Sequence, residues 1–313
     1  MTNCSIILIA YYGDPWLPTC LKSLITASRT KLHLIIGDNF GNGELSEVYH
    51  SHFETEVINL AGPQGFAIAN NNTLVSCSRL GDYVLFLNQD TISTASWIDH
   101  CIALLESDKE LGAVSPLIRT YDGSTWDPSF LDCLSTEQRQ SLDKVNMFPV
   151  MYTEHAPAPA LIIRKSVLGS VGPFDPIYGS YYEDYDLCER IRAAGYKVGF
   201  CCTALIQHYS GSSTSTRERE LKRMQQIIRN RSIYQIRYGR NSRIRKIAKL
   251  FTVDLILRLG RSIFKTPSSQ PLGPILYAYT DLVKLLPRLL LRAKDESYFR
   301  RYLDHLGWNK VNQ

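Results

Sequence analysis

The strongest constraint on the fold is a regular alternation of short apolar runs with segments of helical periodicity. Residues 5–10 (SIILIA), 32–37 (LHLIIG) and 82–87 (DYVLFL) carry few polar side chains. Strands of this kind are buried on both faces, as in a parallel sheet. Residues 16–28, between the first two runs, repeat leucines at helical spacing. The alternation predicts an α/β fold with a doubly wound, parallel sheet.

The same patterns predict the remaining elements. Strands are expected at 56–60, 112–116, 197–202 and 204–206, and helices at 44–53, 97–107, 184–194 and 218–238, with a further helix ending near residue 78. Residues 119–155 have weak periodicity and several turn residues, which indicates an irregular insertion or flap. Ordered structure is expected to return over residues 156–168.

Charge divides the chain into an acidic body and a basic tail. From Arg217 onward there are 22 lysines and arginines and 7 acidic residues, a net charge of about +15. The preceding residues contain 13 lysines and arginines and 23 acidic residues, a net charge of about −10. Residues 245–264 and 274–294 are apolar helical patterns within this tail. In the first, one face is apolar and surrounded by cations: Ile247, Leu250, Phe251, Leu255 and Leu259 beside Arg245, Lys246, Lys249, Arg258 and Arg261.

Two interpretations of this tail stay open. Cationic amphipathic helices lie in membrane interfaces, so an anionic membrane surface is one predicted partner of residues 211–313. A helical bundle packed on its own domain or on a partner explains the same pattern. The basic residues alternate with aliphatic runs rather than aromatics, which argues against nucleic acid.

Several classes of protein are disfavoured by missing features. Residues 1–13 lack a basic n-region, and no stretch reaches eighteen uncharged apolar residues, so neither a signal peptide nor a spanning helix is expected. The eight cysteines form no CxxC pair, which indicates a reducing cytoplasm without structural disulfides. There is no GxGxxG and no P-loop GKS or GKT, so nicotinamide dehydrogenases and P-loop NTPases lose their main support.

Carboxylates follow two of the predicted strands. Asp38 ends the second strand, and Asn88 and Asp90 come directly after residues 82–87. Ligands bind at the carboxyl ends of such strands. Asp90 could hold Mg²⁺ or Mn²⁺ against a diphosphate, and Asp38 could accept from a base N–H. Taken alone, a turn or helix-capping role explains each of them.

A second group of acids lies in GSYYEDYDLCERI, where Glu183, Asp184 and Asp186 alternate with tyrosines at a predicted helix start. Capping of the positive helix end needs only one of them. A partly buried carboxylate with acidic neighbours has a raised pKa, which suits a general base. His208 ends the last predicted strand and could bind a metal or a phosphate, or be structural.

The ordered set of motifs resembles the inverting glycosyltransferases of family 2, which have the GT-A fold, and especially their rhamnosyltransferase-like branch. The resemblance covers roughly residues 3–238. It is carried by SIILIAYYGDPWLPTCLKSL, IIGDNFGNG, GPQGFAIANN, VLFLNQDT, PALIIRKSVLGSVGPFD, YYEDYDLCERIRAAGYKVGF, QHYSGSS and RNRSIYQIRYG. The QxxRW motif of processive relatives is absent.

The resemblance implies a domain organisation. Residues 1–210 would form the GT-A catalytic domain, a Rossmann-like, mostly parallel sheet flanked by helices. Its nucleotide-sugar half would span about 1–115 and its acceptor half about 116–210. Residues 211–313 would be a basic, amphipathic, α-helical extension.

The resemblance also implies residue roles. Asp184 would be the catalytic base, with Glu183 beside it, and Asp90 and His208 would be the metal ligands. The donor-binding residues would be Tyr11, Asp38, Gly65, Phe66, Asn71, Asn88, Asp90 and Arg190. AYYGD stands where the family usually has a Tyr-Asn or similar pair, which puts the role of Tyr11 in doubt.

The implied reaction is transfer of a sugar, with inversion, from a nucleoside-diphosphate donor to a hydroxyl of a glycan or lipid-linked glycan in surface polysaccharide synthesis. dTDP-rhamnose is the favoured donor and UDP-sugars follow. The enzyme would be cytoplasmic, or peripheral on the inner face of the cytoplasmic membrane, and homo-oligomerisation is left open. The alternatives are a GT-A-like nucleotidyltransferase and a non-catalytic nucleotide-sugar-binding protein. The first should carry a basic loop after the first strand, but AYYGDPWLP has no lysine or arginine.

Overall fold

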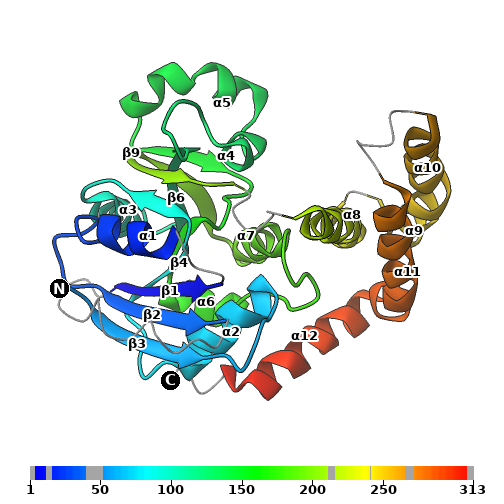
Figure 1. Cartoon of the computed structure of the whole chain (residues 1–313), viewed down its shortest axis with the longest axis horizontal. Helices are drawn as coiled ribbons and strands as arrows, with labels where there is room; N and C mark the ends of the chain where they lie inside the picture. Colours follow the sequence, from blue (N-terminus) through cyan, green and yellow to red (C-terminus); the bar gives the residue numbers. More distant parts are fainter. Residues whose placement is uncertain are drawn as a thin grey trace. The chain divides into compact units, whose positions relative to one another are not determined.

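The computed structural model describes residues 4–11, 16–39, 52–210, 216–239, 241–264 and 271–308. The chain forms two compact units (Figure 1). The first comprises residues 1–179, 184–212 and 308–313, and the second comprises residues 180–183 and 213–307. Most of the helix expected at 44–53 lies outside the described residues.

One sheet of nine strands organises the described part of the first unit, in the order β3-β2-β1-β4-β8-β6-β9-β5, with β7 paired to β9. The strands are β1 (Cys4–Ala10), β2 (His33–Asp38), β3 (Glu54–Asn59), β4 (Tyr83–Asn88), β5 (Thr91–Ser93), β6 (Leu111–Thr120), β7 (Val150–Thr153), β8 (Ala160–Arg164) and β9 (Lys197–His208). The first four run parallel, and β6 is parallel to β9. β8 lies antiparallel between β4 and β6.

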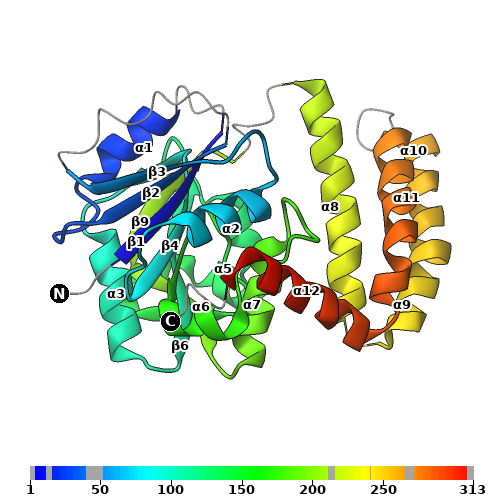
Figure 2. The same ribbon diagram turned by 90° about the horizontal axis from the view of Figure 1, so that it is seen from below.

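The buried strands explain this arrangement. Every residue of β1 and β2 is buried, as the apolar runs predict, because helices flank the sheet (Figure 2). α2 packs on β1 and β2, and α3 packs on β6 and β9. The helices of this unit are α1 (Trp16–Leu24), α2 (Phe66–Ser76), α3 (Trp97–Ser107), α4 (Pro128–Asp132), α5 (Thr136–Gln140), α6 (Lys165–Val171) and α7 (Glu183–Ala193). The predicted mostly parallel α/β sheet is confirmed.

The flap at 119–155 is more ordered than its sequence indicates. It holds α4, α5, the 3₁₀ helix η2 (Leu142–Met147) and β7. Each is too short to establish a period. Caps define the two α-helices instead: Asp127 caps α4, and Ser135 forms a capping box with Gln138 at α5. The two strands expected at 197–202 and 204–206 are one strand, β9, whose pairing with β6 shifts between Pro116 and Leu117.

The second unit is helical. Its elements are α8 (Arg217–Tyr238), α9 (Arg243–Lys249), the π-helical η3 (Leu250–Asp254), α10 (Leu255–Phe264), α11 (Leu272–Leu289) and α12 (Arg292–Leu306). α11 packs along α8 (Figure 2). Leu250 is buried and Phe251 meets the ring of Tyr279 edge-on at 5.5 Å. Part of the face predicted for a membrane is therefore packed inside the bundle.

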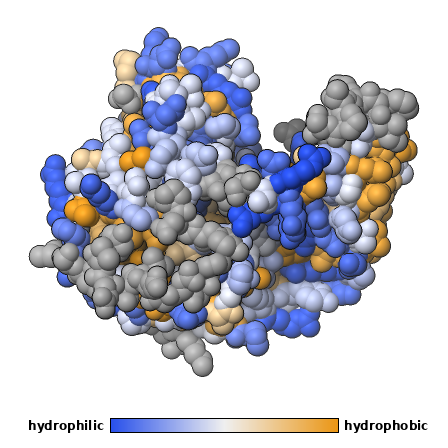
Figure 3. Space-filling view, in the orientation of Figure 1, coloured by the Kyte–Doolittle hydropathy of each residue, from blue (hydrophilic) through white to orange (hydrophobic). Residues whose placement is uncertain are grey.

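A different set of apolar side chains in this unit faces solvent. Figure 3 shows apolar surface over α10 and α11, at the right of the view. The side chains concerned are between 43% and 67% exposed: Val253, Ile256, Leu257, Leu272, Leu276, Tyr277 and Val283. We call these seven residues the exposed apolar face. No helix within the described ranges is both long and apolar enough to cross a membrane.

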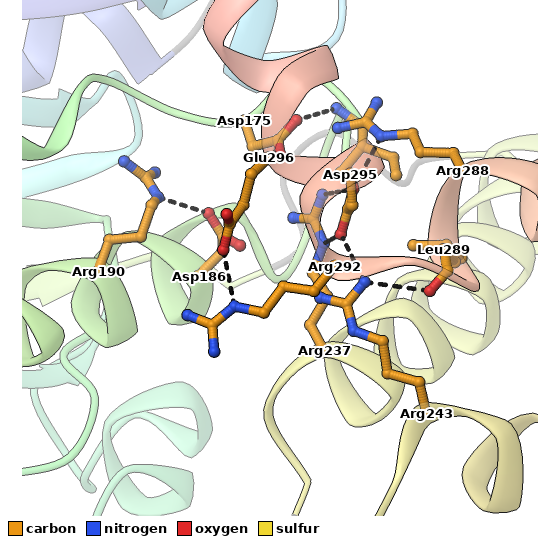
Figure 4. Close-up of polar contacts among 11 residues, drawn as sticks. Asp175, Asp186, Arg190, Arg237, Arg243, Arg288, Leu289, Arg292, Asp295 and Glu296 are labelled. Atoms are coloured by element: carbon orange, nitrogen blue, oxygen red, sulfur yellow. Dashed lines mark hydrogen bonds and ion pairs between the residues drawn. The ribbon is translucent and has the colours of Figure 1, made fainter.

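A buried carboxylate joins four helices of the second unit (Figure 4). Asp295 of α12 accepts two hydrogen bonds from Arg237 of α8, at 2.7 and 2.9 Å. It also accepts from Arg288 of α11 at 2.9 Å and from Arg243 of α9 at 3.3 Å. Burial raises the pKa of Asp295, but the hydrogen bonds and charges of Arg237 and Arg288 lower it more, so the net shift is downward.

We predict that Asp295→Ala loosens the helical unit. Removing this carboxylate from among the three guanidinium groups breaks a largely buried ion network, which costs about 3–5 kcal/mol. Hydrogen exchange of α8 and α12 amides in the full chain should accelerate accordingly. Glu296→Ala is the matched control, because the neighbouring Glu296 makes only an exposed pair with Arg292. Unchanged protection in Asp295→Ala would contradict the assigned role.

Candidate active site

The carboxyl end of β2 fixes the first part of the site. Asp38 is buried there. The adjacent Asn39 donates from Nδ2 to the carbonyl of Gln64 at 2.9 Å and accepts at Oδ1 from the Gln64 N–H at 2.8 Å. The side chain of Asn39 thereby ties the loop before α2 to the strand end. The sequence offers no signal for this pairing beyond the preference of asparagine for turns.

Gly65 in this loop lies against the protein's own backbone. A Cβ atom added there would stand 3.2 Å from both the carbonyl carbon and the oxygen of Gly179. The amide of Ala67 also donates to that oxygen at 2.7 Å. Close approach at Gly65 therefore serves contact with residue 179, and its predicted contact with a donor stays a prediction.

Two further predicted donor residues lie near Phe174. Asn71 donates from Nδ2 to the Phe174 carbonyl at 2.7 Å and accepts from the Phe174 N–H at 3.1 Å. The ring of Phe66 is 5.7 Å from the ring of Phe174, which in turn packs on Phe86 of β4. Asn71 is completely buried, so in this structure it joins α2 to the GPFD segment.

The ends of β1 and β4 are clamped to each other by Gln89. Its Oε1 accepts from the Tyr11 N–H at 2.9 Å, and its Nε2 donates to the Tyr11 carbonyl. Gln89 is not among the site residues predicted from the sequence. The neighbouring Asn88 donates its N–H to the Pro159 carbonyl at 2.9 Å, while its buried Oδ1 has no protein hydrogen-bond partner. An unpaired buried oxygen of this kind suits contact with a ligand.

Asp90 and His208 meet at the same edge of the sheet. β5 and β9 pair antiparallel, which sets Thr91 opposite His208. His208 Nε2 lies 3.5 Å from Asp90 Oδ1, and its Nδ1 lies 3.1 Å from Asp127 Oδ2. All three side chains are buried, Asp127 completely. Asp127 is not predicted as a site residue from the sequence, because nothing in WDPSF distinguishes it from an ordinary N-cap residue.

The carboxylates determine the charge of His208. Burial lowers the pKa of His208, but its hydrogen bonds to Asp127 and Asp90 and their charges outweigh that effect and raise the pKa to about 9. Burial raises the pKa of Asp127, yet the hydrogen bonds from His208, Ser129 and Ser210 bring it down to about 2. Asp127 therefore stays ionised throughout the neutral pH range.

This pair of side chains suits a divalent metal ion. Neighbouring ligands of an octahedral ion at about 2.1 Å lie about 3 Å from each other, close to the 3.5 Å between His208 Nε2 and Asp90 Oδ1. Among the residues that the structure describes, no group of three or more His, Cys, Asp or Glu residues could hold a metal. Other ligands of an ion bound here would be oxygens of a substrate or of water.

Asp184 lies in the first turn of α7. Its Oδ2 accepts from the Ala158 N–H at 3.1 Å and its Oδ1 accepts from the Tyr185 N–H at 2.9 Å. Burial raises the pKa of Asp184, although these N–H donors and the nearby His155 oppose the shift. Since Ala158 precedes Pro159, whose carbonyl accepts from Asn88, a short segment links Asp184 to the end of β4.

The backbone before α7 has an unusual conformation. Gly179, Tyr181 and Tyr182 have φ values of 68°, 70° and 72°, and such a conformation is costly for a tyrosine. Asn230 of α8 is completely buried and donates to the carbonyls of Ser180 and Tyr181 at 2.7 and 2.8 Å. Glu183 follows this segment and is itself buried.

Arg190 lies one turn after Asp186 on α7 and ties this helix to residues 171–173. It donates to Asp186 Oδ2 at 2.9 Å (Figure 4) and to the carbonyls of Val171, Gly172 and Pro173 at 2.7 to 2.8 Å. Asp186, one of the three acids at the predicted helix start, is the ionic partner of Arg190. These contacts give Arg190 a supporting position, and its predicted role in donor binding stays a prediction.

We predict that Arg190→Lys destabilises the first unit by about 2–4 kcal/mol, because an ammonium group cannot reproduce several charge-assisted hydrogen bonds made by one planar guanidinium. The midpoint of urea unfolding measures the loss. Arg192→Lys, on a more exposed part of the same helix, should leave the midpoint nearly unchanged. Equal effects of the two substitutions would contradict the assignment.

Known proteins resemble this chain in sequence. The model of glycosyl transferase family 2 matches residues 5–162. An N-acetylglucosaminyl-diphospho-decaprenol L-rhamnosyltransferase of Mycobacterium tuberculosis is 24% identical over 242 residues, covering 67% of this chain and 76% of that protein. The rhamnosyltransferase WbbL of Escherichia coli is 23% identical over 221 residues, covering 66% of this chain and 83% of that protein.

Solved structures resemble it in fold. The mannosyltransferase PcManGT of Pyrobaculum calidifontis, in complex with GDP-Man and Mn²⁺, aligns with a TM-score of 0.58 and 15% identity, covering 99% of this chain and 85% of that one. Residues 1–349 of S. aureus TarS align with a TM-score of 0.54 and 15% identity, covering 96% and 89%. The family match spans half of the chain, and the sheet is that of GT-A enzymes: the chain belongs to glycosyl transferase family 2 and is a glycosyltransferase.

Proposed function

We propose that this chain is an inverting, metal-dependent glycosyltransferase that moves rhamnose from dTDP-rhamnose, or else a sugar from a UDP-sugar, to a hydroxyl of a glycan or lipid-linked glycan. The observation that carries the proposal is the short link from Asp184 through Ala158 and Pro159 to the strand end where Asn88, Asp90 and His208 lie. The proposed base and the proposed diphosphate site are thus linked through one edge of the sheet.

Names of similar proteins support the substrate classes. Two of the relatives are named rhamnosyltransferases, and the name of the mycobacterial one specifies a lipid diphosphate acceptor. TarS has been solved with UDP-GlcNAc, and PcManGT with GDP-Man and Mn²⁺. A lipid-linked acceptor in surface polysaccharide synthesis is the corresponding proposal for this chain.

Asp184 is the proposed base. Its carboxylate takes the proton of the acceptor hydroxyl as that oxygen attacks the anomeric carbon, and the diphosphate leaves from the opposite side of that carbon. The raised pKa suits this step, because a stronger base removes the proton more readily. Glu183 precedes Asp184 on α7 and is proposed to orient the substrates.

Asp90 and His208 are the proposed ligands of Mg²⁺ or Mn²⁺. The ion, when bound, would neutralise the negative charge that grows on the leaving diphosphate. Asp38 is proposed to accept a hydrogen bond from the donor base. Asn88 is proposed to lie near the sugar or phosphate of the donor, where its buried Oδ1 can accept from a sugar hydroxyl. The proposed donor site is completed by residues that contact the donor or hold those that do: Tyr11, Gly65, Phe66, Asn71 and Arg190.

We predict that Asp184→Asn lowers kcat by about 10²–10⁴-fold, the usual contribution of a positioned base, while the affinity for the nucleotide is kept. Release of nucleoside diphosphate from a panel of nucleotide sugars with Mn²⁺ and acceptor measures turnover, and calorimetry measures affinity. Asp132→Asn, at an exposed carboxylate, is the control. Wild-type turnover in Asp184→Asn would remove this residue as base and favour a different function.

The pH dependence follows from the same carboxylate. Only ionised Asp184 can accept a proton, so kcat should fall as the pH drops through its pKa. Because burial raises that pKa, the acid limb should lie above pH 4, where an ordinary aspartate titrates. An acid limb at or below pH 4 would contradict a raised pKa at the catalytic base.

The second unit is proposed to dock on an anionic membrane surface that carries the acceptor. The exposed apolar face is accompanied by exposed cations on α9, α11 and α12: Arg245, Lys249, Lys284, Arg292 and Lys294. Between residues 243 and 294 there are 11 lysines and arginines and 2 acids. Apolar side chains entering the headgroup region and cations above it favour such a surface.

We predict that the full chain binds phosphatidylglycerol vesicles in a salt-sensitive manner and phosphatidylcholine vesicles weakly. Ile256→Asp with Val283→Asp should weaken binding by roughly tenfold or more, since both substitutions place a charge in the headgroup boundary. Met147→Asp, at an apolar side chain of the first unit that is 76% exposed, is the matched control. Equal binding by all variants would argue against this surface.

A further inference from the structure

The contacts of His208 lead beyond its proposed role as a ligand. We propose that Asp127 is a positioning residue, which fixes the ring and the tautomer of His208 so that Nε2 faces the metal beside Asp90. The inference rests on the proposed function, because it assumes that Asp90 and His208 hold the divalent ion. It assigns a role in the donor site to the flap, 81 residues before His208 in the chain.

Asp127 is held rigidly. It is completely buried, and its own N–H donates to the Ile118 carbonyl of β6 at 3.0 Å. Its Oδ1 accepts from the N–H of Ser129 at 2.7 Å, from the N–H of Phe130 at 3.4 Å and from the Ser129 hydroxyl. Donors at the start of α4 therefore set the plane of the carboxylate.

The second oxygen of Asp127 has no part in capping. Oδ2 accepts from the Ser210 hydroxyl and lies 3.1 Å from His208 Nδ1. An N-cap needs only one oxygen, so helix capping accounts for Oδ1 alone. The other oxygen is directed at the imidazole, where an ionised carboxylate can only accept a hydrogen bond.

The direction of that hydrogen bond decides which ring nitrogen can bind a metal. A metal ion bound at Nε2 would displace the proton from that nitrogen, on the side where Asp90 Oδ1 lies 3.5 Å away, while the proton on Nδ1 stays facing Asp127. Carboxylates that hold metal-binding histidines in this way contribute about 10–100-fold to metal affinity. Asp127 would act on the metal through His208 and touch neither the ion nor the substrate.

Asp127→Asn tests this arrangement. The asparagine can retain the cap through its oxygen, which turns its NH₂ group toward His208. That group donates, so Nδ1 must accept and the ring proton moves to Nε2, where it opposes metal binding. The experiment is titration of the full chain with Mn²⁺ in the presence of UDP, with free Mn²⁺ measured by electron paramagnetic resonance.

We expect Mn²⁺ to bind Asp127→Asn about 10–100-fold more weakly than the wild type. Ser129→Ala is the control, because it removes a hydroxyl from Oδ1 and leaves Oδ2 in place, and it should bind Mn²⁺ like the wild type. Thermal unfolding of both variants shows whether either substitution destabilises the folded structure. Wild-type Mn²⁺ affinity in Asp127→Asn, or an equal loss in folded Ser129→Ala, would overturn the positioning role.

Asp90→Asn separates this inference from the proposed function. If Asp90→Asn loses Mn²⁺ binding while Asp127→Asn keeps it, the metal site stands and Asp127 is a helix cap only. If Asp90→Asn binds Mn²⁺ like the wild type, the assigned metal site is wrong and the role of Asp127 falls with it. If Mn²⁺ binding is lost completely in Asp90→Asn and partly in Asp127→Asn, both proposals are supported.

Discussion

The parallel pairing of β1 with β2 and with β4 is the constraint on which the rest of the site depends. In this register Ala10 lies opposite Asp38, and Ile9 lies opposite Asn88. Because parallel strands end on the same side, residues far apart in the chain arrive at one edge of the sheet. Every residue of β1 and β2 is buried, so the packing of side chains on both faces of the sheet holds these strands in place.

Buried polar side chains then fix the loops that leave this edge. Asn39 fastens the loop before α2, Asn71 fastens the GPFD segment, and Gln89 joins β1 to β4. Each amide makes paired bonds with a backbone, so each loop has one geometry at that point. Asp127 extends the same principle to His208, with a charge in place of an amide. The site is thus rigid where donor binding is proposed.

The helical unit combines a specific interior with an apolar exterior. Asp295 accepts hydrogen bonds from three arginines and thereby fixes how α8, α9, α11 and α12 meet. The exposed apolar face lies on η3, α10 and α11. An ion network of this kind specifies an arrangement more than it adds stability. Exposure of several large apolar side chains is the usual mark of an interaction surface.

The sequence by itself determined the elements with a clear period: the buried strands, α3 at its observed bounds, and α7 with its acidic start. It also selected Asp90, because it follows a strand, and His208, because it ends one. The tertiary structure alone decided the antiparallel insertion of β8, the ordered flap and the meeting of Asp127 with His208. The physical reason is that periodicity along the chain reports which residues are buried within one element. The contact between Asp127 and His208 spans 81 residues and depends on strand register and loop closure, which leave no pattern in the sequence.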